Sequence, residues 1–247
     1  MRKSSPIFAI CLIFVVLVFS QEPSGDWILE QLDENIGSDN KIVLSSMIVH
    51  GRRGSRTIES KSWVQGREKS FTEYLAPPRE KGTKMLKLED QLWTYSPATD
   101  RIIKISGHML RQSVMGSDMS YEDMMEDPRL HKMYSAEIVG EETLFERSCW
   151  VLELVSKDDD NAYHSRKIWV DKERFVALKE DRFARSGKLL KTTEIKEVTR
   201  MQDRWVPRHI IFKDVLKRAQ GTEFILESIE FDAEIPEYVF TKASLRK

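Results

Sequence analysis

The stretch that decides the fold is residues 71–123, which read FTEYLAPPREKGTKMLKLEDQLWTYSPATDRIIKISGHMLRQSVMGSDMSYED. It opens with short runs in which apolar and polar side chains alternate, and turn residues such as Pro77-Pro78 divide these runs. Alternation with a period of two is typical of strands whose two faces differ in polarity. The stretch ends in an acidic, methionine-rich segment opened by Gly116-Ser117-Asp118. It therefore predicts a curved antiparallel sheet and, after it, a segment of another kind.

Strand-like runs continue on both sides of this stretch. After it they recur about every 8–12 residues as far as residue 231, which predicts an antiparallel sandwich, barrel or half-barrel. Before it, a strand over 41–50 follows one helix over 24–36. We expect Asp26 to cap the start of that helix and Gly37 to end it in a left-handed conformation. No βαβ pattern and no break in composition occurs, so we predict a mainly β fold in a single domain, residues 21–247.

The first twenty residues have the pattern of a signal peptide. Arg2 and Lys3 give a positive start, and 7–19 is an apolar run too short to span a membrane comfortably. We expect cleavage after Ser20 and export to the periplasm; the alternative is that the segment is kept as an N-terminal anchor. The formal net charge of −1 provides no broad basic field, so nucleic acid is not an expected partner.

The sequence carries few signs of catalysis. Its five histidines do not have metal-ligand spacing, and no HExxH, paired-cysteine or GxSxG motif occurs. The acidic run 158–161 lacks the spacing of an EF-hand loop and is interpreted as a solvated hairpin tip. We therefore predict a protein that is not an enzyme and that uses no cofactor and no metal.

Methionines gather in the segment that breaks the strand pattern. They are Met109, Met115, Met119, Met124, Met125 and Met133. Three interpretations are open: a Cu(I) site, ordinary core packing, and a deformable apolar surface for ligands of variable shape. A copper site is disfavoured because no cysteine lies nearby and the only local histidines are His108 and His131. Ser120-x-x-Asp123 resembles a capping box with Asp in place of Glu, and it predicts that a helix begins there.

Aromatic residues on the preceding strands are core side chains in most folds. If the sheet is curved and one face stays open, however, the same residues line an apolar cavity. The candidate lipid-binding residues of this cavity and its lid are Trp63, Phe71, Met85, Trp93, Tyr95, Ile103, Met109, Met115, Met119, Tyr121 and Met124. In this interpretation the helix after Asp118 is the lid, and Gly116 lies near its hinge.

Several short motifs together resemble one known family. They are Pro78 with Lys81-Gly82-Thr83, Leu92-Trp93-Thr94-Tyr95-x-Pro97, Met115-Gly116-Ser117-Asp118, Tyr121-Glu122-Asp123 and Ile235-Pro236-x-x-x-Phe240-Thr241. The combination resembles the periplasmic outer membrane lipoprotein-sorting proteins, the LolA-like carriers. This resemblance implies an incomplete antiparallel β-barrel of about eleven strands, with a few helices covering the concave face. It also implies a hydrophobic cavity that takes acyl chains.

The resemblance implies a carrier that binds the acyl chains of lipoproteins or other amphiphilic lipids and passes them between the membranes of the envelope. An inner-membrane exporter and an outer-membrane acceptor are its implied partners, and no ATP or metal is used by the carrier itself. Two alternatives remain open. One is a non-catalytic envelope assembly or interaction module with a filled core that works with a membrane exporter, and the other is a hydrolase or metal-binding protein.

Overall fold

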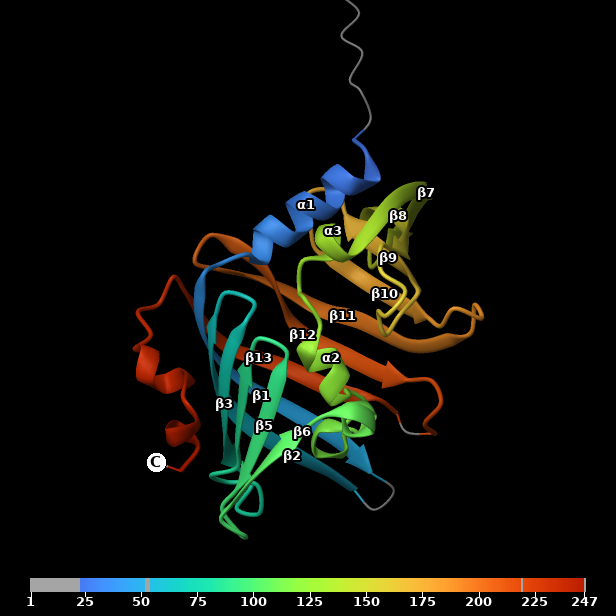
Figure 1. Cartoon of the computed structure of the whole chain (residues 1–247). Coiled ribbons are helices and arrows are strands. Elements are labelled where there is room, and N and C mark those ends of the chain that lie inside the picture. The colour runs from blue at the N-terminus through green and yellow to red at the C-terminus, as the bar shows by residue number, and fades with distance from the viewer. Residues whose placement is uncertain (1–22, 52–53, 219, 247) are drawn as a thin grey trace, which may run out of the picture.

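One antiparallel sheet of 13 strands organises the computed structural model, which describes residues 23–51, 54–218 and 220–246. The strands are β1 (Asn40–Gly51), β2 (Gly54–Gln65), β3 (Lys69–Ala76), β4 (Lys84–Leu88), β5 (Gln91–Ser96), β6 (Arg101–Ile105), β7 (Tyr134–Leu144), β8 (Arg147–Ser156), β9 (Ser165–Asp171), β10 (Ala177–Phe183), β11 (Leu189–Met201), β12 (Arg204–Asp214) and β13 (Thr222–Phe231). Their order in the sheet is β6-β5-β4-β3-β2-β1-β13-β12-β11-β10-β9-β8-β7. The sheet is curved and open, since β6 and β7 form its two edges (Figure 1). The predicted incomplete barrel is confirmed, with 13 strands in place of about eleven.

Short helices cover both faces of the sheet. On the inner, concave face lie α1 (Gly25–Ile36), α2 (Tyr121–Met125) and α3 (Leu130–Met133), with the 3-10 turns η1 (Gly107–Arg111) and η2 (Val114–Gly116) (Figure 1). The 3-10 turns η3 (Glu237–Phe240) and η4 (Lys242–Arg246) pack on the outer face, against β3, β4 and β5.

Ser24, rather than Asp26, caps α1. The Ser24 Oγ accepts a hydrogen bond from the Trp27 N–H at 3.2 Å. The Asp26 carboxylate instead accepts a hydrogen bond from the Ala136 N–H at 2.9 Å, which ties the helix to β7. Gly37 has φ of −64°, so the prediction of a left-handed helix end is also wrong. Serine and aspartate are both good caps, and the sequence pattern alone does not decide between neighbours.

Replacing Ser24 with alanine is expected to lower the free energy of unfolding by about 1 kcal/mol, because the Trp27 N–H loses its acceptor. Urea unfolding followed by circular dichroism measures this change. Glu30→Ala, at an exposed position of the same helix, is the matched control and should change stability by less than about 0.5 kcal/mol. A loss in Ser24→Ala no larger than that of the control would contradict the capping role.

Alternation along β2–β5 places the large aromatic side chains on the outer face. Trp63 is the register partner of Phe71, Phe71 of Leu86, and Leu86 of Trp93, so the four side chains point to one side of the sheet. The C-terminal segment covers them with its buried apolar side chains, which are Ala233, Ile235, Phe240 and Leu245. The outer face of this half of the sheet is therefore closed by the end of the chain.

Residues 106–133, here called the crossing segment, connect β6 to β7. Because these two strands are the opposite edges of the sheet, the chain must pass from one edge to the other before it can continue. It does so across the inner face, through η1, η2, α2 and α3 (Figure 1). Over β1–β6 the inner face is thus covered by the short turns and helices of the crossing segment, whereas α1 covers it over β7–β9.

The predicted signal peptide, residues 1–20, lies outside the described residues. Where the chain is described, no helix combines the length and the apolar character that crossing a membrane requires.

Candidate functional site

An apolar patch lies on the inner face of strands β1–β6. Its buried members, here called the apolar patch, are Met47, Val49, Ile58, Tyr74, Met85, Leu92 and Ile105. The Tyr74 hydroxyl donates to the Met85 sulfur at 3.3 Å, so the polar atom of this buried ring is occupied. Burial raises the pKa of Tyr74 well above its ordinary value, which keeps the phenol neutral. Tyr74 consequently adds no charge to the patch.

Side chains of the crossing segment cover the apolar patch. This set, here called the methionine cover, consists of Met109, Leu110, Val114, Met115, Tyr121, Met124 and Met125. Methionine is unbranched and adapts its shape to what it contacts, so a cover rich in it can be replaced by another flexible apolar group. Only Val114 among these seven is fully buried, which leaves the outer side of the cover partly in solvent.

Hydrogen bonds fasten the middle of the crossing segment to the sheet. Asp118 accepts from the Thr222 hydroxyl at 2.8 Å and from the Asp214 N–H at 3.1 Å, while its own N–H donates to Thr222 Oγ1 at 2.9 Å. The Lys217 ammonium donates to Ser113 Oγ at 2.7 Å. These bonds tie the segment to β12, β13 and the turn between them, in the middle of the sheet.

The backbone turns sharply just before this anchor. Met115 has φ of 49° and Gly116 has φ of 71°, so two consecutive residues are left-handed. Glycine adopts this conformation without steric cost, whereas methionine does so only at some cost in energy. The Arg56 guanidinium donates to the Met115 carbonyl and holds the turn against β2. The hinge that the sequence predicts at Gly116 thus falls on a real turn.

The predicted capping box is confirmed. Ser120 Oγ accepts from the Asp123 N–H at 3.2 Å, and the Asp123 carboxylate accepts from the Ser120 N–H at 2.6 Å. The five-residue helix α2 begins there and ends at Met125, ahead of Pro128. Its cap therefore fixes the orientation of a helix too short to be stable by itself.

Three cationic side chains form a row on the inner face of β9, β10 and β11. In the register of the sheet, Arg182 pairs with Arg166 on one side and with Lys191 on the other. Side chains at paired positions point to the same face, and like charges placed there repel each other. This arrangement, here called the cation row, is therefore unfavourable unless carboxylates compensate it.

Three carboxylates compensate the cation row, and two of them come from the crossing segment. Glu180 of β10 accepts from Arg166 Nη1 at 2.5 Å and from Arg182 Nη2 at 2.8 Å. Glu126 forms an ion pair with Arg166, and Asp123 forms one with Lys191. Asp123 also lies 3.5 Å from Arg182 Nη1. Three positive and three negative charges thus meet between the sheet and α2.

The pKa values of the carboxyls reflect these contacts. Burial by itself raises the pKa of Glu180, but the charges of Arg182 and Arg166 outweigh it and hold the pKa at about 2. For Asp123 burial is likewise opposed, by the charge and hydrogen bond of Lys191, and the pKa lies below its ordinary value. For Glu126 burial prevails over the nearby arginines, so its pKa is raised. Burial thus outweighs the neighbouring cations at Glu126, whereas the cations outweigh burial at Asp123.

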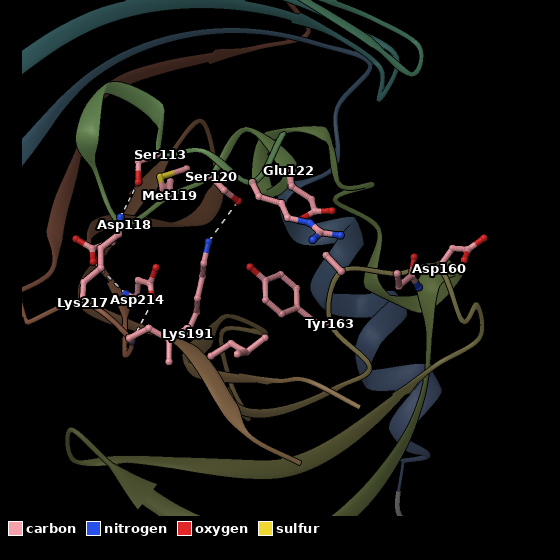
Figure 2. A pocket seen from close by; sticks show the side chains of 15 residues that line it. Ser113, Asp118, Met119, Ser120, Glu122, Asp160, Tyr163, Lys191, Asp214 and Lys217 are labelled. Carbon is pink, nitrogen blue, oxygen red and sulfur yellow. Dashed lines mark hydrogen bonds between the residues drawn. The ribbon is translucent and has the colours of Figure 1, made fainter. Parts of the chain in front are cut away.

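Two polar cavities adjoin the cation row. The larger, about 460 Å³, opens between the crossing segment and the tips of β11 and β12. Its lining holds the basic side chains Arg111, Lys191 and Lys217 and the acidic side chains Asp118, Glu122, Asp160 and Asp214. Figure 2 shows Lys191 and Tyr163 pointing into it from opposite sides. The smaller, about 150 Å³, is lined by Arg182 and Lys191 together with Asp123 of α2. The row is thus reached from solvent at the end where Lys191 stands.

The structure divides the predicted cavity residues between two faces. Six belong to the inner face: Met85, Met109, Met115, Tyr121 and Met124 meet at the patch and its cover, and Ile103 stands at the edge of the Met85 row, 44% exposed. Met119 lines both polar cavities. The other four lie under the C-terminal segment on the outer face: Trp63, Phe71, Trp93 and Tyr95. No single cavity is therefore lined by all eleven.

Sequence reasoning missed the cation row. One signal was present, because Arg166 alternates with Ile168 and Val170 along β9 and so interrupts an otherwise apolar face. A charged side chain on a buried face is the informative exception in a strand. Pairing it with Arg182 and Lys191, however, requires the register of three strands. Among the described residues, no group of three or more histidine, cysteine, aspartate or glutamate side chains is arranged to hold a metal ion.

Comparison with known proteins places this geometry among related folds. A family model described as "Uncharacterized protein" matches residues 66–247. A domain assigned to the outer membrane lipoprotein-sorting proteins, from Vibrio parahaemolyticus, is similar at 23% identity and a TM-score of 0.79, over 90% of this chain and 98% of that chain. A DUF1329 family protein from Desulfovibrio piger is similar at 20% identity and a TM-score of 0.82, over 90% and 97%. A LolA superfamily protein from Nitrosomonas europaea is similar at 22% identity and a TM-score of 0.74, over 90% and 99%.

These likenesses show that the chain has the fold of the LolA-like lipoprotein-sorting proteins, as its motifs predicted. A search of curated proteins finds no match.

Proposed function

We propose that this chain, which belongs to the family whose model spans residues 66–247 and has the LolA-like fold, is a periplasmic carrier for the acyl chains of lipoproteins or other amphiphilic lipids. The observation that carries the proposal is an apolar patch on the concave face that is covered by methionine side chains of a short, irregular segment. The bound acyl chain takes the place of that cover. An inner-membrane exporter as donor and an outer-membrane acceptor complete the proposed route.

The energies of such an exchange are of similar size. An acyl chain of a dozen or more carbons gains about 0.8 kcal/mol per methylene when it leaves water, which amounts to about 10 kcal/mol. Exposing three fully buried methionine side chains would cost about 5–9 kcal/mol, and exposing those of the cover costs less because they are only partly buried. Binding is therefore favourable but reversible, which suits a carrier that has no energy source and moves its cargo only downhill.

The lid of this proposed carrier consists of residues 115–126 of the crossing segment. It is tied to the sheet through Asp118 and through the ion pairs of α2, and it contains the left-handed turn at Met115 and Gly116. A segment held by a few polar contacts can be lifted as a unit without breaking the pairing of the 13 strands, although the isolated bridge between Ser113 and Ser120 must open.

Mass spectrometry of protein purified without detergent tests the carrier directly. Copurified lipid, or saturable uptake of a fluorescent fatty acid by the delipidated protein, is the expected result. Fastening the lid to β13 should stop this uptake. Asp118→Cys combined with Thr222→Cys places two thiols where side-chain oxygens now lie 2.8 Å apart. Uptake should fall at least about tenfold in the oxidised form and return on reduction. Equal uptake by the oxidised and the reduced forms would show that uptake does not require the lid to move.

A non-catalytic interaction module is the second candidate, and one observation favours it. The methionine cover already fills the space over the apolar patch, as the side chains of a permanent core would. A module of this kind would copurify with no lipid and would take up no fatty-acid probe in either redox form of the paired-cysteine variant. The same two measurements therefore distinguish it from the carrier.

A further inference from the structure

The crossing segment has the chemistry of an anionic amphiphile. Within α2, Asp123 faces the cation row while its neighbours Met124 and Met125 pack over the apolar patch. Glu126, the next residue, extends the acidic side to Arg166. A five-residue helix thus presents negative charge to one part of the concave face and flexible apolar groups to the adjoining part.

The cation row depends on this helix for its compensation. The sheet itself contributes three cations and, among the side chains that contact them, one carboxylate, Glu180. Three minus one leaves two positive charges that Asp123 and Glu126 neutralise. When the lid leaves the face, those two charges need another anion, because an uncompensated buried charge is strongly unfavourable. At the end of the row, Asp214 is the register partner of Lys191. Its carboxylate accepts a hydrogen bond from the Leu216 N–H, and the ion pair of Lys191 is formed with Asp123.

The row also has donors that α2 does not use. Arg166 Nε and Arg182 Nε are buried and have no hydrogen-bond partner among the described residues, and the Arg166 side chain is only 2% exposed. A buried donor without an acceptor is costly and rare in folded proteins. A headgroup with several oxygens can satisfy donors that a single carboxylate at a fixed backbone position does not reach.

A headgroup has room to enter beside Lys191. The cavity of about 460 Å³ opens to solvent there, and the cavity of about 150 Å³ continues inward to Arg182 (Figure 2 shows the first). Lys191 lines both cavities. The route from solvent to the row is therefore polar, and it ends next to the lid that covers the apolar patch.

The geometry points to an anionic amphiphile as the cargo: its carboxylate or phosphate pairs with Arg182 and Lys191, and its chain lies on the apolar patch. In the empty carrier, Asp123 and Glu126 form the ion pairs that the headgroup would form, and the methionine cover occupies the place of the acyl chain. This inference rests on the proposed function, which requires only an acyl chain and is indifferent to the charge of the headgroup.

Three amphiphiles with the same chain test the inference on the full chain. Palmitate, hexadecyl phosphate and hexadecanol each displace a fluorescent fatty-acid probe from delipidated protein, and their affinities are compared. Palmitate or hexadecyl phosphate should bind at least about tenfold more tightly than hexadecanol. The ratio of the affinities for palmitate and for hexadecyl phosphate shows whether the carboxylate or the phosphate is the preferred headgroup. Equal binding of all three overturns the inference but leaves the carrier intact, while no binding of any overturns both.

Two variants and one matched control assign the preference to the row. Lys191→Gln should reduce the preference for palmitate over hexadecanol to about twofold or less, because the cation row then lacks one of the two cations that pair with the headgroup. Lys167→Gln removes a lysine of β9 that lies over Trp169 and points away from the row, and it should keep the preference. Asp123→Asn retains the capping oxygen but removes the competing charge, so palmitate should bind several-fold more tightly than to the wild type.

The opposite signs of these effects separate recognition from structural damage. A substitution that only loosens the fold would weaken the binding of palmitate and of hexadecanol alike, and it would do so in both Lys191→Gln and Asp123→Asn. Circular dichroism confirms that each variant is folded. If Lys191→Gln does not fold, the gain in Asp123→Asn still decides the matter, and weaker palmitate binding in that variant would overturn the inference.

Discussion

Replacing Glu180 with alanine is expected to lower the free energy of unfolding by about 3–5 kcal/mol. Glu180 is the carboxylate through which the sheet itself compensates the cation row, with bonds of 2.5 Å to Arg166 and 2.8 Å to Arg182. Its removal leaves both guanidinium groups facing each other across paired strands. The net value of a buried ion pair is small, but the loss of one partner is costly because the remaining charge stays buried.

Urea unfolding at neutral pH measures this loss. Glu197→Ala is the matched control, since Glu197 lies on the neighbouring strand β11 and pairs with Arg208 at 3.0 Å on the exposed surface. Exposed pairs contribute less than about 1 kcal/mol, so the control should be nearly as stable as the wild type. Similar losses in the two variants would mean that the cation row is not held together by Glu180.

Much of the fold follows from local pattern. The alternation in residues 71–105 predicts the strands, and Ser120-x-x-Asp123 predicts the start of α2, because both signals depend on neighbours in the chain. The count of about eleven strands, which the family resemblance implied, was low by two. The cap of α1 was misplaced because Ser24 and Asp26 satisfy the same rule.

The site was less predictable, for two physical reasons. Strands β2–β5 are apolar on both faces. Alternation therefore predicts that Trp93 and Met85 point to opposite faces, but it does not show which face is concave. The C-terminal segment decides this by covering the outer face, a contact between residues more than a hundred positions apart. The cation row in turn depends on the register of β9, β10 and β11, in which a bulge near Ala177 shifts the pairing. No local pattern encodes that shift.

Acid is expected to destabilise the fold by several kcal/mol, with the loss beginning as the pH falls through the ordinary range of carboxyls. Among the described residues, six carboxyls have a lowered pKa in the folded chain: Asp123, Asp127, Asp171, Glu180, Glu223 and Glu237. A group with a depressed pKa binds its proton more weakly when folded, so the unfolded chain takes up more protons as the pH falls. The stability that such a group contributes is fully present at a pH above its pKa in the unfolded chain. It is lost as the pH falls from that value to the pKa in the folded chain.

Glu180 sets the scale and the window of this loss. Its pKa falls from 4.5 to about 2, which corresponds to about 3 kcal/mol lost between about pH 5 and pH 2. Glu126 acts in the opposite direction, because its raised pKa favours the folded chain once it is protonated, but it is one group against six. Urea midpoints measured from neutral pH to about pH 3 test the balance. Glu180→Gln should start less stable than the wild type and decline less steeply, because the group that titrates most strongly is absent. Parallel declines in the two proteins would place the acid sensitivity elsewhere than in the contact between the cation row and its carboxylates.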